Sequence, residues 1–216
     1  MTENLKMNNN LLIFAKYSFS YIAYAALAFA VFYILGFEFL ATVSFFVVLF
    51  LMYTFRNPER ELQNFDTASI LSPCDGIVTS IEEIQNSDYS YKIEIESSFM
   101  DVGVLRHPIN GEIKDTLLTR GVKVSKRSKL FSSLSESLLI EYIDEKQNSL
   151  KVVHQLKGSF FPIFSELKKG DKTFKSLRYG FASNALTTIY LKNNVRLDLQ
   201  VGQSLKASES LIAYFS

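Results

Sequence analysis

The chain has 216 residues, of which 48% are hydrophobic, and it carries a formal net charge of +1 at pH 7. Its charges form no basic stripe, so the composition gives no reason to expect a nucleic-acid partner. Cys74 is the only cysteine, which excludes an internal disulfide and argues against a zinc site built on cysteines.

Two apolar segments follow an amino-terminal segment of residues 1–16. They cover residues 17–35 and 39–55, and each runs for about seventeen to nineteen residues without a formal charge. A helix of that length spans a hydrocarbon core of about 30 Å at about 1.5 Å of rise per residue. Only three residues connect the two segments, so we predict a transmembrane helical hairpin over residues 17–55.

Positive charges flank the predicted hairpin. Lys6 and Lys16 precede it, Arg56 and Arg60 follow it, and the connection carries only Glu38. By the positive-inside rule both ends face the cytoplasm, which predicts a multi-pass protein of the inner cell membrane with its remaining domain in the cytoplasm. A cleaved signal peptide fits less well because the apolar stretch recurs after one turn. A buried hairpin of a soluble protein fits less well because both segments are apolar all round.

The rest of the chain, residues 56–216, has the size of one ordinary domain. Residues 91–96 alternate apolar and charged side chains, the pattern of a strand with one face in water. Residues 138–143 and 150–155 repeat this pattern on either side of a polar turn and predict a hairpin. Residues 189–191 and 195–201 flank a Lys-Asn-Asn turn and predict a second hairpin.

The best helix candidate in this domain covers residues 161–169. Pro162 is tolerated in a first helical turn, and Gly170 stands where helices commonly end. Many strands with short turns and one short helix predict a mainly β fold, a compact barrel or sandwich.

Two pieces of the domain look alike. The first is Ser72-Pro73-Cys74-Asp75-Gly76-Ile77-Val78, and the second lies within residues 195–213. They resemble the paired half-motifs of biotinyl and lipoyl carrier domains, in which two hairpins close a flattened barrel. The carrier lysine of those domains is missing, because the turn at Asn193-Asn194 offers only Lys192. A carrier or adaptor module is therefore a weak reading, and the same half-motifs occur in another family.

That family is the phosphatidylserine decarboxylases, in their short form with two amino-terminal membrane helices. Phe55-Arg56-Asn57-Pro58-Glu59-Arg60 resembles its Phe-Arg-Asp-Pro-x-Arg segment, and Ser72-Pro73-Cys74-Asp75-Gly76 resembles its Ser-Pro-Ala-Asp-Gly turn. Residues 99–111 are similar to its Asp-Val-His-Val-x-Arg-x-Pro-x-x-Gly strand, and residues 190–203 are similar to its closing segment, Tyr-Leu-Pro through Val-Gly-Gln. The matches run in family order over nearly the whole chain.

The resemblance implies an unusual chemistry on a phospholipid substrate in a membrane. The chain of such an enzyme cuts itself at a Gly-Ser bond, and the serine becomes an amino-terminal pyruvoyl group. The ketone of this group takes up electrons as the serine lipid loses carbon dioxide, the role that pyridoxal phosphate plays elsewhere. An Asp–His pair resembling that of a serine protease activates the hydroxyl. No metal is implied.

Asp75 matches the family aspartate, although Asp-Gly is also a favoured turn for purely local reasons. The family histidine falls on Gly103, which has no side chain and cannot act as a base. His107 lies four residues later, on the strand face where alternation would place it beside Gly103. His107 is therefore a candidate for the general base, although it is also compatible with an ordinary core or surface histidine. His154 is a weaker candidate for the same role.

The serine position has two alignments. Counting back from Tyr190 places the family Gly-Ser on Asn184-Ala185, which has no hydroxyl. Matching Phe181-Ala182-Ser183-Asn184 to Phe-Gly-Ser-Arg recovers a serine but needs about two extra residues before the strand. Ala182 then replaces the glycine that gives a cleavage turn its backbone freedom. The Gly158-Ser159 pair comes too early in the chain, so Ser183 is the candidate nucleophile and pyruvoyl precursor.

Other polar positions of the family pattern are also altered. Ser135-Glu136-Ser137 replaces an Asn-Glu-Arg phrase, and Phe161-Pro162-Ile163-Phe164 replaces an Ala-Arg-Arg segment. The missing arginines matter because a guanidinium is the natural partner of a lipid phosphate or carboxylate.

Two hypotheses follow. In the first, the protein is a membrane-bound phosphatidylserine decarboxylase of phosphatidylethanolamine biosynthesis that uses Asp75, His107 and a pyruvoyl group from Ser183. In the second, it is an inactive relative that binds lipid headgroups or scaffolds a partner. Self-cleavage within residues 181–186 distinguishes them.

Overall fold

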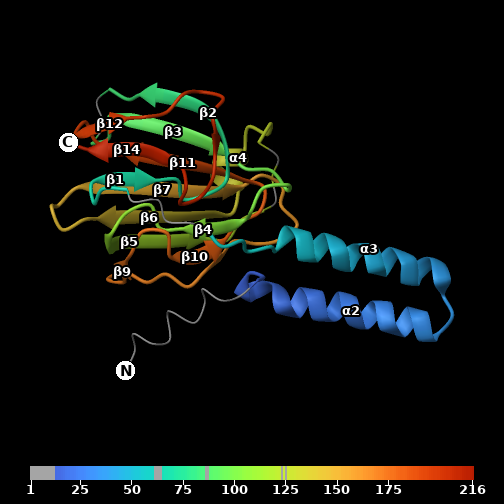
Figure 1. Cartoon of the computed structure of the whole chain (residues 1–216). Helices are drawn as coiled ribbons and strands as arrows, with labels where there is room; N and C mark the ends of the chain where they lie inside the picture. The colour runs from blue at the N-terminus through green and yellow to red at the C-terminus, as the bar shows by residue number, and fades with distance from the viewer. Residues whose placement is uncertain (1–12, 61–64, 86–87, 123, 125) are drawn as a thin grey trace. The chain divides into compact units, whose positions relative to one another are not determined.

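The computed structural model describes residues 13–60, 65–85, 88–122, 124 and 126–216 (Figure 1). They fall into two compact units, Met1–Glu59 and Arg60–Ser216, which we call the helical unit and the β unit. The fold is mainly β, as the sequence predicts.

The helical unit is an antiparallel pair of apolar helices. A 3-10 turn, Lys16–Ser18, leads into α2, Phe19–Ile34, and α3 covers Glu38–Thr54. Gly36 lies in the reversal with a φ of +76°, a conformation that glycine adopts without strain. The rings of Phe29 and Phe45 lie 5.9 Å apart between the helices.

Backbone hydrogen bonds join the two ends of this pair. The amide of Ala15 donates to the carbonyl of Phe55 at 2.9 Å, and the amide of Asn57 donates to the carbonyl of Ile13 at 2.8 Å. The helix Lys16–Ile34 is long and apolar enough to cross a membrane, whereas Glu38–Thr54 is a shorter apolar helix. Length and composition alone are weak evidence of membrane association, so the crossing stays a prediction.

The β unit contains three antiparallel sheets. Its largest sheet has eight strands in the order β13-β2-β3-β11-β7-β6-β5-β9, curling around one side of the core (Figure 1). These strands are Ser204–Leu205, Gly76–Glu83, Tyr91–Glu96, Ala185–Leu191, Ser149–Leu156, Ser137–Ile143, Gly111–Thr119 and Lys172–Thr173.

Two three-stranded sheets complete the unit, in the orders β1-β14-β12 and β4-β10-β8. Their strands are Ser69–Leu71, Leu211–Phe215, Val195–Leu197, Val104–Arg106, Arg178–Phe181 and Phe164–Ser165. The short helix α4 covers Phe131–Leu134.

The two similar pieces of sequence lie side by side in the fold. Ile77 of β2, in the first piece, faces Ser204 of β13, in the second, and Ile70, just before the first piece, faces Ala213 of β14. The resemblance to paired half-motifs therefore has a structural counterpart in two antiparallel pairings between the start and the end of the β unit.

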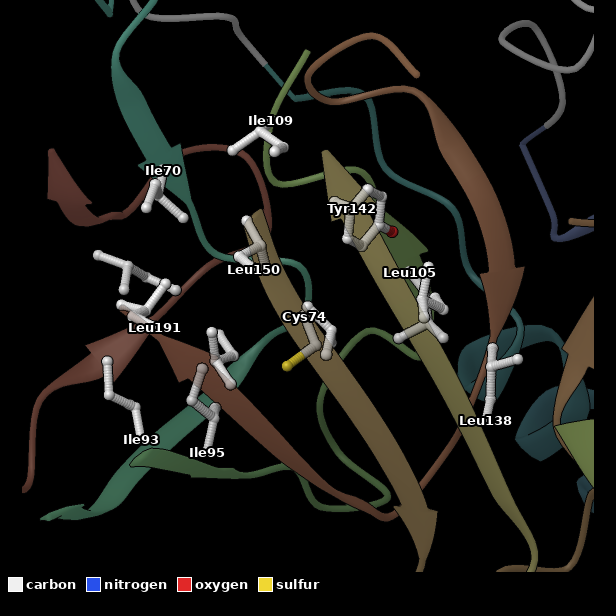
Figure 2. Packing of buried hydrophobic residues seen from close by; sticks show 14 of the residues in the cluster. Ile70, Cys74, Ile93, Ile95, Leu105, Ile109, Leu138, Tyr142, Leu150 and Leu191 are labelled. Carbon is white, nitrogen blue, oxygen red and sulfur yellow. The ribbon is translucent and has the colours of Figure 1, made fainter. Parts of the chain in front are cut away.

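Alternation places one face of each long strand in the core. In β7 every second residue is buried, and β6 follows the same rule. Figure 2 shows part of the result, a buried cluster that contains Tyr142, Leu105, Ile109, Leu150 and Cys74. Burying such side chains stabilises the fold by about 1.5–3 kcal/mol each. The predicted hairpin of residues 138–143 and 150–155 is confirmed as β6 and β7.

Two predictions about the β unit are wrong. Val195 pairs with Phe215 of β14 and not with β11, because the Lys-Asn-Asn turn carries the chain from one sheet into another. No helix forms within residues 161–169. There the amide of Ile163 donates to Oε1 of Glu136, and Phe164 pairs with Phe181, so tertiary partners override the local signal.

Candidate active site

Asp75 lies in the buried turn between β1 and β2, and both of its carboxylate oxygens are bonded. Oδ2 accepts a hydrogen bond from Nη2 of Arg60 at 2.7 Å, and Oδ1 accepts one from the amide of Ala207 at 2.8 Å. The hydroxyl of Ser97 donates to the backbone carbonyl of Asp75 at 2.5 Å. Asp75 therefore links Arg60 at the start of the β unit to Ala207 near its end. It also stands at the position of the aspartate in the family motif.

Three arginines surround this carboxylate. Nη1 of Arg60 also lies 3.3 Å from Oε1 of Glu209, and Arg106 of β4 is the register partner of Arg178 in β10. Burial, together with the positive charges of Arg178 and Arg60, lowers the pKa of the Arg106 guanidinium to about 10. Arg106 stays protonated at neutral pH, so the three arginines exceed the two carboxylates Asp75 and Glu209 by one positive charge.

Gly103 marks the place where the family pattern has its histidine. The amide of Ala182 donates to the carbonyl of Gly103 at 2.8 Å, so this position lies directly beside the Ser183 segment. A Cβ atom at residue 103 would approach the ring of Phe181 to 2.7 Å. The ring of Phe181 therefore occupies space that a side chain at residue 103 would need. Position 103 therefore lies where the family pattern needs a general base for Ser183, but glycine has no side chain to act as one.

Ser183 is buried in the turn between β10 and β11. Its Oγ has no hydrogen-bond partner among the described residues, and the side chains of Ala182 and Ala185 beside it are also buried. A buried hydroxyl without a partner costs roughly 1–3 kcal/mol. Such a group merits a functional explanation, and a nucleophile held away from water is one.

Asn184 makes the turn possible. Its φ is +52°, a left-handed conformation that asparagine tolerates better than most residues. Its Nδ2 donates to the carbonyl of Lys157 at 2.6 Å, and the amide of Lys157 donates back to the carbonyl of Asn184 at 2.9 Å. The positive φ therefore falls one residue after Ser183, at the position that the first alignment, counted back from Tyr190, assigns to glycine.

His107 is buried between two tyrosines. Its Nδ1 lies 3.2 Å from the hydroxyl of Tyr142, and its ring centroid lies 4.7 Å from that of Tyr179. Its amide donates to the carbonyl of Leu177 at 2.9 Å. These contacts fit the reading of His107 as a core histidine.

His154 continues the same chain of polar groups. Its Nε2 lies 2.6 Å from the hydroxyl of Tyr179, and its Nδ1 lies 2.8 Å from Oγ1 of Thr187. The ring of Tyr179 also packs against that of His107. Burial lowers the pKa of His154 to about 3, so its ring is neutral at physiological pH. Both histidines of the chain thus belong to one buried polar chain through the core.

Sequence reasoning did not find this polar chain or the arginine cluster. The sequence did contain one signal of the polar chain. Every second residue of β6 and β7 is buried, and Tyr142 and His154 occupy such positions among apolar residues. A polar group in such a register must find a buried partner. No group of three metal-ligating side chains occurs among the described residues.

Comparison with known proteins gives a consistent result. Residues 47–213 match the family model described as phosphatidylserine decarboxylase. A protein of Geobacter sp. (strain M21) named phosphatidylserine decarboxylase proenzyme is 32% identical over 186 residues, covering 82% of this chain and 83% of that protein.

Two further relatives carry the same name. The protein of Carboxydothermus hydrogenoformans is 32% identical over 181 residues, covering 80% of this chain and 83% of its own. The protein of Geobacter metallireducens is 28% identical over 218 residues, covering 95% of this chain and 98% of its own. The last match therefore includes the apolar helices as well as the β unit.

Proposed function

The chain belongs to the phosphatidylserine decarboxylase family, and from that premise we propose that it is a membrane-bound decarboxylase that cuts itself before Ser183. The family places it in phospholipid biosynthesis, with a phospholipid as substrate. The product would be phosphatidylethanolamine. The observation that carries the proposal is the buried Oγ of Ser183, which has no hydrogen-bond partner within the described part of the chain and lies in a turn beside the family's histidine position.

The residues present suit a serine-derived pyruvoyl group in part. Ser183 supplies the hydroxyl, and its burial excludes water from the bond to Ala182. When present, the pyruvoyl group supplies a ketone that accepts electrons as carbon dioxide leaves. The ion pair of Asp75 with Arg60 keeps the turn between β1 and β2 in place. Ala182 suits the cleavage turn less well than glycine, because its Cβ narrows the accessible backbone conformations.

Removing the proton from Oγ of Ser183 is the difficult step. Gly103 cannot accept it, and the ring of His107 bonds to Tyr142 and packs against Tyr179. General base catalysis typically contributes a factor of about 10² to 10⁴. We therefore expect self-cleavage to be slow, with Ser183 relying on its desolvated position and the tight turn at Asn184.

The positive cluster around Asp75 offers a place for the anionic headgroup. Arg106 and Arg178 face each other in register, and a guanidinium binds carboxylate or phosphate through paired hydrogen bonds. These arginines would hold a headgroup close to the β10 strand, which leads directly to Ser183. Their presence offsets the missing arginines near residues 161–164.

We propose that the helical unit anchors this activity in the bilayer as a two-helix hairpin. Both helices are apolar, and backbone hydrogen bonds join the segments before α2 and after α3. Such a pairing suits a hairpin whose two ends leave the membrane on the same side. The flanking lysines and arginines favour the cytoplasmic side of the inner membrane.

A second candidate function rests on one specific observation. Gly103 has no side chain, and the ring of Phe181 lies where one would go. A relative that has lost the base in this way could bind lipid headgroups or scaffold a partner without catalysis.

One experiment separates the two candidates. The full chain is purified from membranes, and its intact mass is compared with that of a Ser183→Ala variant. Cleavage of the first and not the second supports the enzyme. Two uncut chains of full mass support the silent relative.

A further inference from the structure

One end of the β unit gathers the ends of five strands. The register pairs Glu96 with Leu186, Ala185 with Leu156, Gln155 with Ser137, and Ser137 with Thr119. The segments that leave these strands therefore share one end of the sheet. We call them the rim: residues 97–101, 120–136, 157–163 and 182–184, apart from 123 and 125.

Contacts between segments hold the described part of the rim together. Oε2 of Glu96 bonds to Nζ of Lys126 at 2.7 Å, and its Oε1 bonds to Nζ of Lys157 at 2.6 Å. The rings of Phe99 and Phe160 lie 5.3 Å apart. The turn that contains Ser183 is part of the same rim, because Asn184 bonds to Lys157.

Apolar side chains on the rim are unusually exposed. Ten large hydrophobic side chains are exposed among the described residues of the β unit, and five of them lie on the rim. These are Met100 at 66% exposure, Phe160 at 65%, Val122 at 62%, Leu130 at 56% and Leu134 at 44%. Single exposed hydrophobic residues need no explanation, but a group at one end of a domain marks an interaction surface.

Positive charge accompanies these apolar side chains. The sequence of residues 120–134 contains five lysines and arginines and no acidic residue, although the whole chain has a net charge of only +1. Among the described residues, Arg120, Lys126, Arg127 and Lys129 are all exposed. The opposite end of β7 differs, since its turn is the polar sequence Asp-Glu-Lys-Gln-Asn at residues 144–148.

We propose that the rim docks the β unit onto an anionic bilayer surface, independently of the apolar helices. Exposed aromatic and aliphatic side chains insert at the boundary between headgroups and acyl chains, and lysines and arginines attract anionic headgroups. The combination favours a lipid surface over a protein partner, because interface cores on proteins are depleted of lysine. The inference rests on the proposed function in one respect: a decarboxylase of phospholipids needs a lipid surface close to Ser183.

The test places a fluorescent probe at chosen positions of the full chain. Burial raises the pKa of the Cys74 thiol to about 12, so labelling is directed to introduced cysteines. Leu130→Cys and Phe160→Cys report on the rim, and Lys146→Cys in the polar turn at the other end of β7 is the matched control. All three replace exposed residues, so the core is unchanged.

Each labelled protein is reconstituted into vesicles of phosphatidylcholine and phosphatidylglycerol that contain spin-labelled lipid. We expect quenching at residues 130 and 160 and none at residue 146. The quenching at both rim positions should fall in vesicles without phosphatidylglycerol, or when Lys129→Glu is introduced.

Two results would overturn the proposal. One is equal, weak lipid quenching at all three positions. The other is protection of residues 130 and 160 from an aqueous quencher without lipid quenching, which would assign the rim to a protein partner. Phosphatidylglycerol has no serine headgroup, and labelled proteins with Ser183→Ala should behave identically. Failure of decarboxylation is therefore distinguishable from failure of docking.

Discussion

The amide of Ala182 donates a hydrogen bond to the carbonyl of Gly103 at 2.8 Å, which fixes the residue before Ser183 beside a position that has no side chain. The proposed nucleophile, Ser183, therefore lies beside position 103, where the family pattern has its histidine and this chain has a glycine. The first two predictions below follow from this relationship.

Replacing Ser183 with alanine should abolish chain cleavage without loss of stability. The substitution removes a buried hydroxyl that has no partner, so we expect the free energy of unfolding to be unchanged or to rise by about 1 kcal/mol. Denaturing gels and urea unfolding in detergent measure the two effects. Ser135→Ala is the matched control, because its Oγ is also buried without a partner and it lies outside the cleavage turn. Cleavage that persists in Ser183→Ala would assign the nucleophile elsewhere.

Gly103→Ala should destabilise the β unit through its clash with the ring of Phe181. A new Cβ would stand 2.7 Å from that ring, and overpacking of this kind costs about 1–3 kcal/mol. Phe181→Leu leaves room for the new methyl group, so the double variant should lose less stability than the sum of the two single variants. A double-mutant cycle from urea unfolding measures this coupling. Strictly additive losses would show that Phe181 does not restrict residue 103.

Asp75→Asn should weaken the β unit by about 2–3 kcal/mol, toward the lower end for a disrupted buried ion pair. The substitution keeps an acceptor for the amide of Ala207 but removes the charge that compensates Arg60, whose remaining carboxylate partner is Glu209. Lys92→Gln, which disrupts ion pairs with Glu82 and Glu94, is the control and should cost less than about 1 kcal/mol. Equal losses in the two variants, measured by chemical unfolding, would contradict a structural role for Asp75.

Acid should destabilise the protein partly through His154. Burial lowers its pKa to about 3 in the folded state, whereas an unfolded histidine titrates near 6.5. As the pH falls from 7, His154 therefore becomes protonated in the unfolded chain before it does in the folded protein. The contribution of His154 is complete above about pH 6.5 and falls by roughly 1.4 kcal/mol per pH unit as the pH drops below it.

Unfolding of the wild type and of His154→Gln between pH 7 and pH 5 tests this prediction. The groups that face His154 are Tyr179 and Thr187, and neither changes charge in this range. We expect the stability difference between the two proteins to shrink as the pH falls. A difference that does not depend on pH would show that His154 accepts a proton in the folded state.

Local patterns account for the parts of the fold that the sequence predicts. The two apolar helices follow from long runs without a charge, and the hairpin of β6 and β7 follows from the alternation of apolar and polar residues. The pairing of Val195 with Phe215 depends on partners from separate parts of the chain, which no local pattern encodes. The expected helix at residues 161–169 is lost for a similar reason, because Glu136 and Phe181 bind that segment as an extended chain.

In the candidate site, too, local patterns predict some residues, whereas contacts between distant segments determine the others. Motif spacing locates Asp75, Gly103 and Ser183, each from a few adjacent residues. The chain of His107, Tyr142, Tyr179 and His154 could not be predicted, because its members come from different strands and meet only in the folded core. The ion pair of Arg60 with Asp75 likewise joins residues fifteen positions apart, which no local pattern brings together.

The intact mass of the full chain purified from membranes tests the central claim most directly. Self-cleavage before Ser183 predicts two fragments, residues 1–182 and 183–216, with the second blocked at its amino terminus by a group that reacts with a ketone reagent. A single uncut chain of 24.6 kDa, unchanged after long incubation, would contradict the claim and leave a silent lipid-binding relative.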